Sequence, residues 1–182
     1  MHKTHGTILA GVVLAASLAI ALPATAAAPR WYGGATLDQN SASDFGGTTG
    51  FSIFGGYRPP IHLPAGRLAV EAGYDHFGSF SVNGLPAGFT ESVSAYDIEG
   101  SAVYSYPFMK TFAVYGRAGL AAENASATGT YPGYTYSAAG STINLLLGVG
   151  VSWRVVRHIA VRAEYRGEGD IRSFEIGATY GF

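Results

Sequence analysis

The chain has 182 residues, the size of one domain, with a formal net charge of −1 and only 13% charged residues. This balance excludes the strongly basic surface of a nucleic-acid-binding protein, and the absence of cysteine excludes disulfides and thiolate metal sites. Past residue 28, no apolar run reaches the roughly 20 residues that a membrane-spanning helix needs. The chain is therefore either a soluble β-protein or a β-barrel in which apolar and polar residues alternate.

The first 26 residues have the pattern of an export signal. Lys3 supplies the positive start, residues 8–22 are apolar, and Ala24-Thr25-Ala26 supplies the small residues of a cleavage site. We expect cleavage after Ala26 or Ala27, which leaves residues 27–182 as one barrel domain. Lipid attachment is excluded because no cysteine follows the cut.

The rest of the chain divides into eight segments in which apolar and polar residues alternate with period two, as in a β-strand with one apolar face. In chain order they are 31–38, 48–57, 67–77, 93–106, 111–122, 142–153, 158–166 and 174–182. Ten residues tilted by about 40° rise roughly 25 Å, the height of an outer-membrane apolar band. The pattern predicts an all-β fold, an eight-stranded antiparallel up-and-down transmembrane β-barrel.

The connections between these segments differ in length. Segments 39–47, 78–92 and 123–141 are predicted long loops, whereas 107–110 and 154–157 are tight turns; segment 58–66 is intermediate. Long extracellular loops and short periplasmic turns are typical of outer-membrane barrels. We therefore expect the N-terminus of the barrel in the periplasm. The short connection 167–170 departs from this pattern.

Aromatic residues gather at the two ends of the apolar faces, as expected for side chains at a lipid–water interface. The predicted periplasmic girdle is Trp31, Tyr57, Tyr106, Phe112, Trp153 and Phe182, and the outer girdle is Phe51, Tyr74, Tyr96, Tyr165 and Phe174. A soluble barrel would show the same alternation with its apolar face inward, so alternation alone does not decide. The export signal, the girdles and the terminal Phe182 favour a membrane barrel.

Several short segments together resemble the OmpA-type eight-stranded outer-membrane barrels over the whole mature chain. They are Trp-Tyr-Gly-Gly at 31–34, Val-Glu-Ala-Gly-Tyr-Asp at 70–75, Tyr-Gly-Arg-Ala-Gly at 115–119 and Val-Arg-Ala-Glu-Tyr at 161–165. The resemblance implies a monomer in the outer membrane, with lipid, lipopolysaccharide and the barrel assembly machinery as partners. Phe182 and Tyr180 look like the assembly signal of such barrels. We expect no cell-wall tether, because no peptidoglycan-binding domain follows the barrel.

The inward faces of the predicted strands carry charged residues, and a barrel of eight strands has an interior that side chains fill. A buried charge must be paired, so these residues are candidates for an interior plug: Glu71, Asp97, Glu99, Arg117, Arg162 and Glu164, with Arg166 beside them. Glu71 and Arg162 match the plugging pair that the resemblance implies. The positions of its two exchange partners hold Val103 and Ser152, so we predict a plug without a switch and a small conductance. Inward glycines leave a narrow leak open as an alternative.

The predicted function is a structural or surface role with at most narrow, porin-like permeation, and no enzymatic activity. A first alternative is an enzyme that modifies lipid A or phospholipid, which needs a histidine, a serine and an acid close together. The nearest approach is Asp75-His76 with Ser79 and Ser81, and we expect His76 to be an interfacial histidine instead. A second alternative is a soluble ligand-binding barrel.

Neither a cofactor nor a metal is predicted, because the five histidines show no metal-ligand spacing. In the third predicted long loop, Tyr131, Tyr134 and Tyr136 are the best candidates for a surface contact, although a merely solvated loop is the plainer interpretation.

Overall fold

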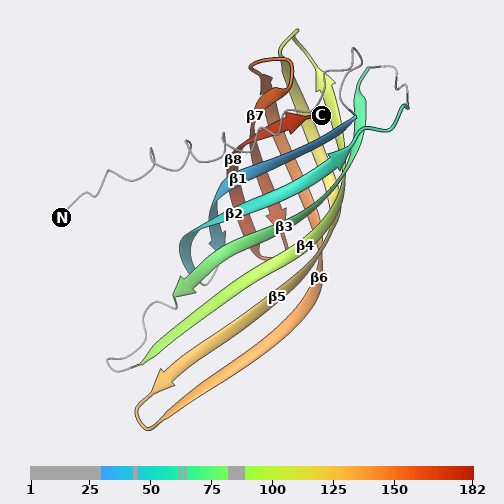
Figure 1. Cartoon of the computed structure of the whole chain (residues 1–182). Coiled ribbons are helices and arrows are strands. Elements are labelled where there is room, and N and C mark those ends of the chain that lie inside the picture. Colours follow the sequence, from blue (N-terminus) through green and yellow to red (C-terminus); the bar gives the residue numbers. More distant parts are fainter. Residues whose placement is uncertain (1–29, 43–44, 62, 64, 82–88) are drawn as a thin grey trace, which may run out of the picture.

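The chain folds into one closed antiparallel barrel in which each strand pairs with its neighbours in the sequence and β1 pairs with β8 (Figure 1). The computed structural model describes residues 30–42, 45–61, 63, 65–81 and 89–182, so the predicted export signal lies outside it. The strands are β1 (Trp31–Ala42), β2 (Phe45–Tyr57), β3 (Arg67–Ser81), β4 (Thr90–Pro107), β5 (Phe112–Tyr131), β6 (Tyr134–Arg154), β7 (Ile159–Glu168) and β8 (Ile171–Gly181). The predicted fold class is confirmed.

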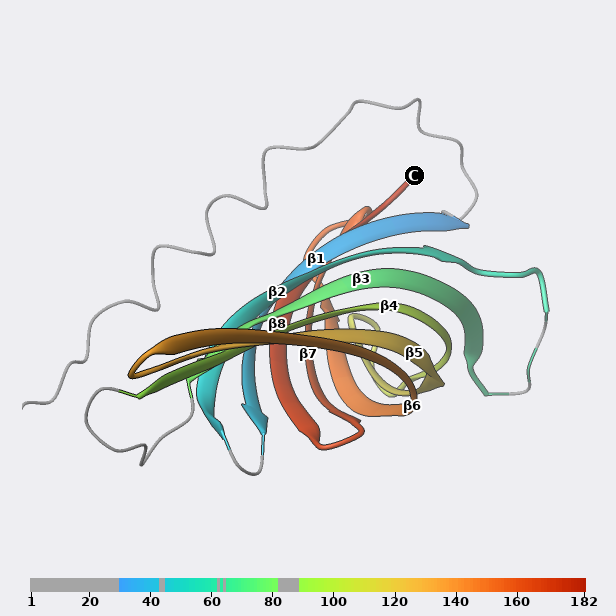
Figure 2. The same ribbon diagram turned by 90° about the horizontal axis from the view of Figure 1, so that it is seen from below.

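The strands curl around a common interior (Figure 2). Among the described residues there is no helix with the length and apolar character needed to cross a membrane. The barrel has two unlike ends. One, which we call the turn end, holds the connections 58–66, 108–111 and 155–158. It also holds Trp31, the first residue of β1, and Phe182, which directly follows β8. The other is the extended end.

The prediction of long loops at the extended end was wrong for most of their length. β5 and β6 stay paired out to Tyr131 and Tyr134, with the turn at Pro132-Gly133, and β1 and β2 stay paired out to Ala42 and Phe45. β3 and β4 are also longer than predicted; residues 82–88 between them lie outside the described residues. We call residues 124–141 of this β5–β6 hairpin the extension. Figure 1 shows it reaching well past the ends of β7 and β8.

The extension was missed because its sequence lacks the apolar–polar alternation by which the other strands were recognised. Ser137-Ala-Ala-Gly-Ser141 has only small side chains, without a large apolar residue at every second position. Both faces of this part of the hairpin meet water, so no alternation is required, while backbone pairing needs no particular side chain. β6 begins to pair with β7 only at Leu146, so in the described chain residues 134–145 pair with β5 alone.

The outside of the barrel is apolar and the lumen is polar, which decides the question that alternation left open. Ile98 and Val149 are 63% and 65% exposed on the outer face, whereas Glu71 and Arg162 are 2% and 5% exposed. A soluble barrel would need the opposite arrangement, because water would surround its outer face. Lipid-facing apolar residues that alternate with a polar lumen are the arrangement of a transmembrane barrel.

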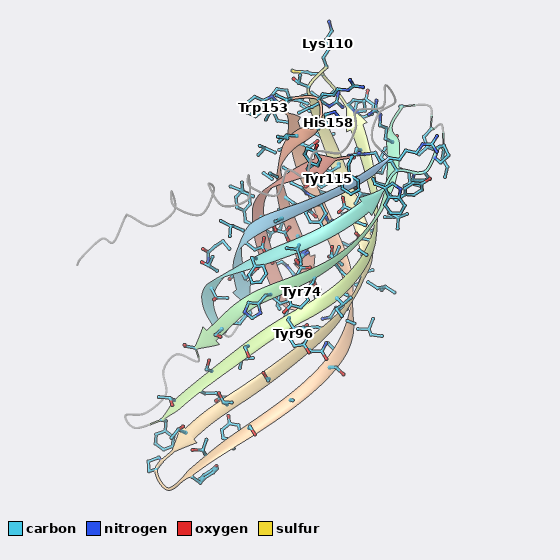
Figure 3. The ribbon with its side chains drawn as sticks, in the orientation of Figure 1. Tyr74, Tyr96, Lys110, Tyr115, Trp153 and His158 are labelled. Atoms are coloured by element: carbon cyan, nitrogen blue, oxygen red, sulfur yellow. The ribbon has the colours of Figure 1, made fainter. Side chains whose placement is uncertain are left out.

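Both predicted aromatic girdles exist as contacts between neighbouring strands. At the turn end, the Trp31 and Tyr57 rings are 4.6 Å apart, and Phe112 stacks on Trp153 at 5.9 Å. Towards the extended end, Tyr74 lies 5.9 Å from Tyr96. Figure 3 places Trp153 near the turn end and the two tyrosines farther along the barrel. The apolar band between the girdles is the part of the barrel that fits a bilayer.

Candidate functional site

The lumen is the candidate site, because strands β3, β4, β5, β7 and β8 send charged side chains into it. Their arginines and carboxylates form two layers across the barrel, which we call the inner layer, nearer the turn end, and the outer layer. Alternation places every second residue of a strand in the lumen. Glu71 and Arg162 lie in the inner layer, and the residues four positions further along the same strands, Asp75 on β3 and Arg166 on β7, lie in the outer layer.

The inner layer is built on Arg117 and Arg162. Arg117 contacts Glu71 at 2.5 Å, Glu99 at 2.5 Å and Glu164 at 3.0 Å. Arg162 contacts Glu71 at 3.2 Å and Glu164 at 2.5 Å. Two guanidinium groups thus share three carboxylates, and all five side chains are at most 6% exposed. Buried ions of opposite charge can be held in such a place only when paired this closely.

Two tyrosines complete the inner layer on its turn-end side. The Tyr32 hydroxyl donates to Glu71 Oε1 at 2.6 Å, and the Tyr115 hydroxyl donates to Glu164 Oε2 at 2.9 Å while accepting from Arg162 Nε at 3.0 Å. These phenols provide hydrogen bonds that the arginines do not supply, so the carboxylates are satisfied from two directions.

Glycine on the neighbouring strand makes room for each tyrosine ring. Gly56 pairs with Tyr32 and Gly150 pairs with Tyr115 in the strand register. A Cβ atom at either glycine would collide with the ring of that tyrosine. Tyr32 and Tyr115 also pack with three apolar side chains of the lumen, which are Phe54, Ala69 and Val103.

The outer layer is built on Arg166. Its guanidinium contacts Asp75 at 3.2 Å, Glu99 at 3.1 Å and Glu175 at 3.0 Å. Glu99 belongs to both layers because its second oxygen holds Arg117. Asp38 lies in the same part of the lumen and accepts hydrogen bonds from Thr36 at 2.6 Å and Ser52 at 2.7 Å.

Five of the six predicted plug residues meet in the inner layer: Glu71, Glu99, Arg117, Arg162 and Glu164. The sixth, Asp97, is fully buried but forms no ion pair with an arginine of the described chain; it lies beside Glu168 instead. Val103 packs in the apolar part of the lumen, and Ser152 pairs with Arg162 in the strand register, so neither adds a charge.

Sequence reasoning did not assign Tyr32, Tyr115 or Glu175 to the network. The alternation of lumen-facing and lipid-facing residues along each strand could have identified them as lumen residues. Tyr115 precedes the inward-facing Arg117 by two residues, and Glu175 alternates with the lipid-facing Phe174 and Ile176.

The side chains of Asp75 and His76 are not close enough in space to act together as an acid and a base. Asp75 and His76 are consecutive on β3 and point to opposite faces of the sheet. The Asp75 carboxylate is buried in the lumen against Arg166, while the His76 ring lies 5.6 Å from the ring of Phe51 on the outside. Within the described residues, no group of three or more His, Cys, Asp or Glu side chains could hold a metal ion.

A family model for the outer membrane protein beta-barrel domain matches residues 12–182. The chain belongs to this family. The N-terminal β-barrel domain of OprF from Pseudomonas aeruginosa is similar, with 13% identity, 83% of this chain and 97% of that chain covered, and a TM-score of 0.52. Ail, the attachment invasion locus protein of Yersinia pestis, has 14% identity, coverage of 84% and 96%, and a TM-score of 0.51.

Neisserial surface protein A has 22% identity, coverage of 84% and 96%, and a TM-score of 0.51. Such low identities show a common fold and no more. No curated protein gives a significant match. The predicted resemblance to eight-stranded outer-membrane barrels is confirmed, and the chain is an outer-membrane protein.

Because the chain belongs to an outer-membrane family, the surroundings of the outer and inner faces of the barrel can be stated. The exposed apolar band faces lipid, and the buried lumen network lies inside this band.

Proposed function

We propose that this outer-membrane barrel has a structural and surface role and is closed to solutes by its lumen network. The observation that carries the proposal is that the ion pairs cross the lumen. Arg162 on β7 reaches Glu71 on β3, and Arg117 on β5 reaches Glu164 on β7. A solute that moved along the barrel axis would have to separate these pairs.

The strength of these contacts argues for a closed lumen. Removing one member of a buried ion pair costs about 3–5 kcal/mol, because the remaining charge is left buried without compensation. A permeating ion would have to disturb the contacts of both layers. We therefore expect at most rare, small conductance events.

The orientation follows from the end at which the strands continue past their neighbours, since β5 and β6 extend well beyond β7 and β8. In bacterial barrels the periplasmic end is short and the longer segments project outward. We therefore place the turn end in the periplasm and the extension outside the cell. Tyr134 is 62% exposed at the tip of the hairpin and Tyr136 is half-buried, so this tip is where a contact with an outside surface would form. The side chain of Tyr131 lies outside the described residues.

The remaining partners follow from the family and the resemblance together. We propose a monomer surrounded by outer-membrane lipid and lipopolysaccharide, and inserted by the barrel assembly machinery through its terminal strand. Phe182 closes that strand: its N–H donates to the Trp31 carbonyl at 3.0 Å, and its ring lies 6.5 Å from Tyr180.

An enzymatic role on lipid A or phospholipid is not supported, because Asp75 and His76 point to opposite faces. Lipid A should therefore have the same mass spectrum in cells that contain the protein, contain the His76→Ala variant or lack the protein. A change that depends on His76 would establish the enzyme instead.

Conductance tests the closed lumen directly. Purified protein in planar bilayers should show no large stable openings. The Arg117→Ala/Arg162→Ala double variant should conduct more, because it removes both cations of the inner layer. Arg172→Ala serves as the control, since Arg172 is exposed at the extended end and bonds backbone carbonyls. Large stable channels in the unaltered protein would refute the proposal.

A further inference from the structure

Charge is distributed unevenly along the barrel axis. Among the described residues, the carboxylate side chain nearest the turn end is Glu71, four residues into β3, which starts at Arg67. Apart from the carboxyl group of Phe182, every charged group at the turn end that the structure describes is a cation. These cations are Arg30, Arg58, Arg67, Lys110, Arg154 and Arg157. In a protein with a net charge of −1, such separation of sign creates a local field at one end.

A cavity of about 570 Å³ opens among these cations. Its walls include Arg58, Arg67, Lys110, Arg154 and Arg157, which come from all three turn-end connections and the strand residues beside them. Its floor is the turn-end side of the inner layer, with Tyr32, Tyr115, Arg162 and one carboxylate, Glu71, among the lining residues. Glu71 is held there by Arg117 and Arg162. Figure 3 shows Lys110 and His158 at this end, with Tyr115 deeper in the barrel.

Three of the cavity's cations, Arg67, Lys110 and Arg154, have no ion pair within the described residues. Burial lowers the pKa of the Arg58 guanidinium, and the charges of Arg67 and Arg154 act in the same direction, while Glu71 opposes them. Neighbouring like charges are stabilised by an anion placed between them.

We propose that the turn-end cavity binds an anion that carries one or more phosphate groups. A cleft lined by one sign of charge concentrates counter-ions, and guanidinium groups bind phosphate and carboxylate through paired hydrogen bonds. Phosphate fits better here because the cations converge from three separate connections, and phosphate offers three acceptor oxygens rather than the two coplanar oxygens of a carboxylate. The volume lies within the usual range of small-ligand sites, about 300–1,000 Å³.

The cavity is a place to bind rather than an entrance to a channel. Its floor is closed by the inner layer. Beyond that floor the buried charged residues of the described lumen are mainly acidic, because five carboxylate residues face one arginine: Asp38, Asp75, Asp97, Glu168 and Glu175 against Arg166. An anion that enters from the turn end is therefore attracted to the cavity and repelled from the rest of the lumen.

Titration calorimetry with inorganic tripolyphosphate tests the site. The folded barrel in uncharged maltoside micelles should bind the probe with a stoichiometry of one. Arg154→Gln/Arg157→Gln should weaken binding at least about tenfold, the effect of losing roughly 1.4 kcal/mol of charge-assisted contact. Both side chains are exposed, Arg154 at the end of β6 and Arg157 in the turn that follows, so the barrel should still fold, which heat-modifiable migration on gels checks.

The matched control is Arg172→Gln, which removes an exposed arginine at the opposite end and should leave the affinity unchanged. Absence of binding to the unaltered protein would overturn the proposal. Equal weakening in the control and the double variant would overturn it as well, because it would show attraction to net charge alone.

Two nanodisc compositions distinguish the two sources of phosphate at a periplasmic surface. If the cavity takes the headgroup of an anionic phospholipid, phosphatidylglycerol in the disc should lower the apparent affinity for tripolyphosphate relative to phosphatidylcholine alone. That difference should disappear in Arg154→Gln/Arg157→Gln. If the natural occupant is a soluble phosphate ester, the two discs should give equal affinities for the unaltered protein, with the tenfold effect of the variant retained.

Discussion

Replacing Arg117 by methionine tests whether the lumen network is truly removed from water. Arg117 makes three ion pairs at 2.5, 2.5 and 3.0 Å, and its side chain is 2% exposed. Methionine has a similar length and no charge. Arg162 alone would then hold Glu71 and Glu164, and Arg166 alone would hold Glu99 together with its other carboxylates. We expect the free energy of unfolding to fall by about 3–5 kcal/mol, the usual cost of breaking a buried pair from one side.

Equilibrium unfolding in lipid vesicles measures this loss. The chain has two tryptophans, and both Trp31 and Trp153 face lipid at the turn end, so their fluorescence reports release from the membrane. Arg172→Met, at an exposed site, should stay within about 0.5 kcal/mol of the unaltered protein. Adding Glu99→Gln to Arg117→Met should recover part of the loss, because it removes one uncompensated charge. A loss below about 1 kcal/mol for Arg117→Met would mean that water reaches the network, and the reasoning would fail.

Three further outcomes are expected. Val149→Arg, in the lipid-facing band, should lower the free energy of unfolding by about 2–4 kcal/mol in the same assay. Ser141→Arg, on the same face of β6 but in the extension, should lower it by only about 0–1 kcal/mol. Equal losses would contradict the assigned membrane band. Because the chain has no native cysteine, Thr135→Cys should react with an impermeant maleimide on intact cells and Val156→Cys should not, and the reverse result would invert the orientation. Phe182→Ala should slow the appearance of the heat-modifiable form in cells without changing the final fold, and unchanged kinetics would remove the assembly role.

The membrane part of the fold could be predicted from the sequence because lipid imposes a rule on every second residue. Leu145, Leu147 and Val149 must be apolar when the same strand exposes them to acyl chains, and Gly148 need not be. Beyond the membrane that rule ends. The extension keeps its pairing through backbone hydrogen bonds and the turn at Gly133, whose φ of +98° suits glycine, so a rule based on side chains had nothing to detect.

Which residues form ion pairs across the lumen depends on closure of the barrel, and no local sequence pattern predicts how the barrel closes. Glu71 and Arg162 are 91 residues apart in the sequence, and so are Asp75 and Arg166. The equal separation has a simple geometric cause, since advancing four residues on both β3 and β7 keeps the phase of the alternation and moves each member by about 13 Å along its strand. The first pair and the strand directions therefore imply the second. The sequence did not reveal that Glu99 would connect the two layers, because that depends on the stagger between β4 and its neighbours.

The charged lumen also helps to specify which face of each strand meets lipid. Buried ion pairs are a poor source of stability, and well-packed apolar residues of similar volume would often serve as well or better. A lumen filled with apolar side chains, however, would make the two faces of every strand alike, and a strand could then slip by one residue at little cost. Here a one-residue slip of β7 would expose Arg162, Glu164 and Arg166 to acyl chains and bury Val161 and Tyr165 in the lumen. At about 2–4 kcal/mol for each arginine near the bilayer midplane, such a slip is strongly disfavoured. The same charges that close the barrel therefore help to fix its register.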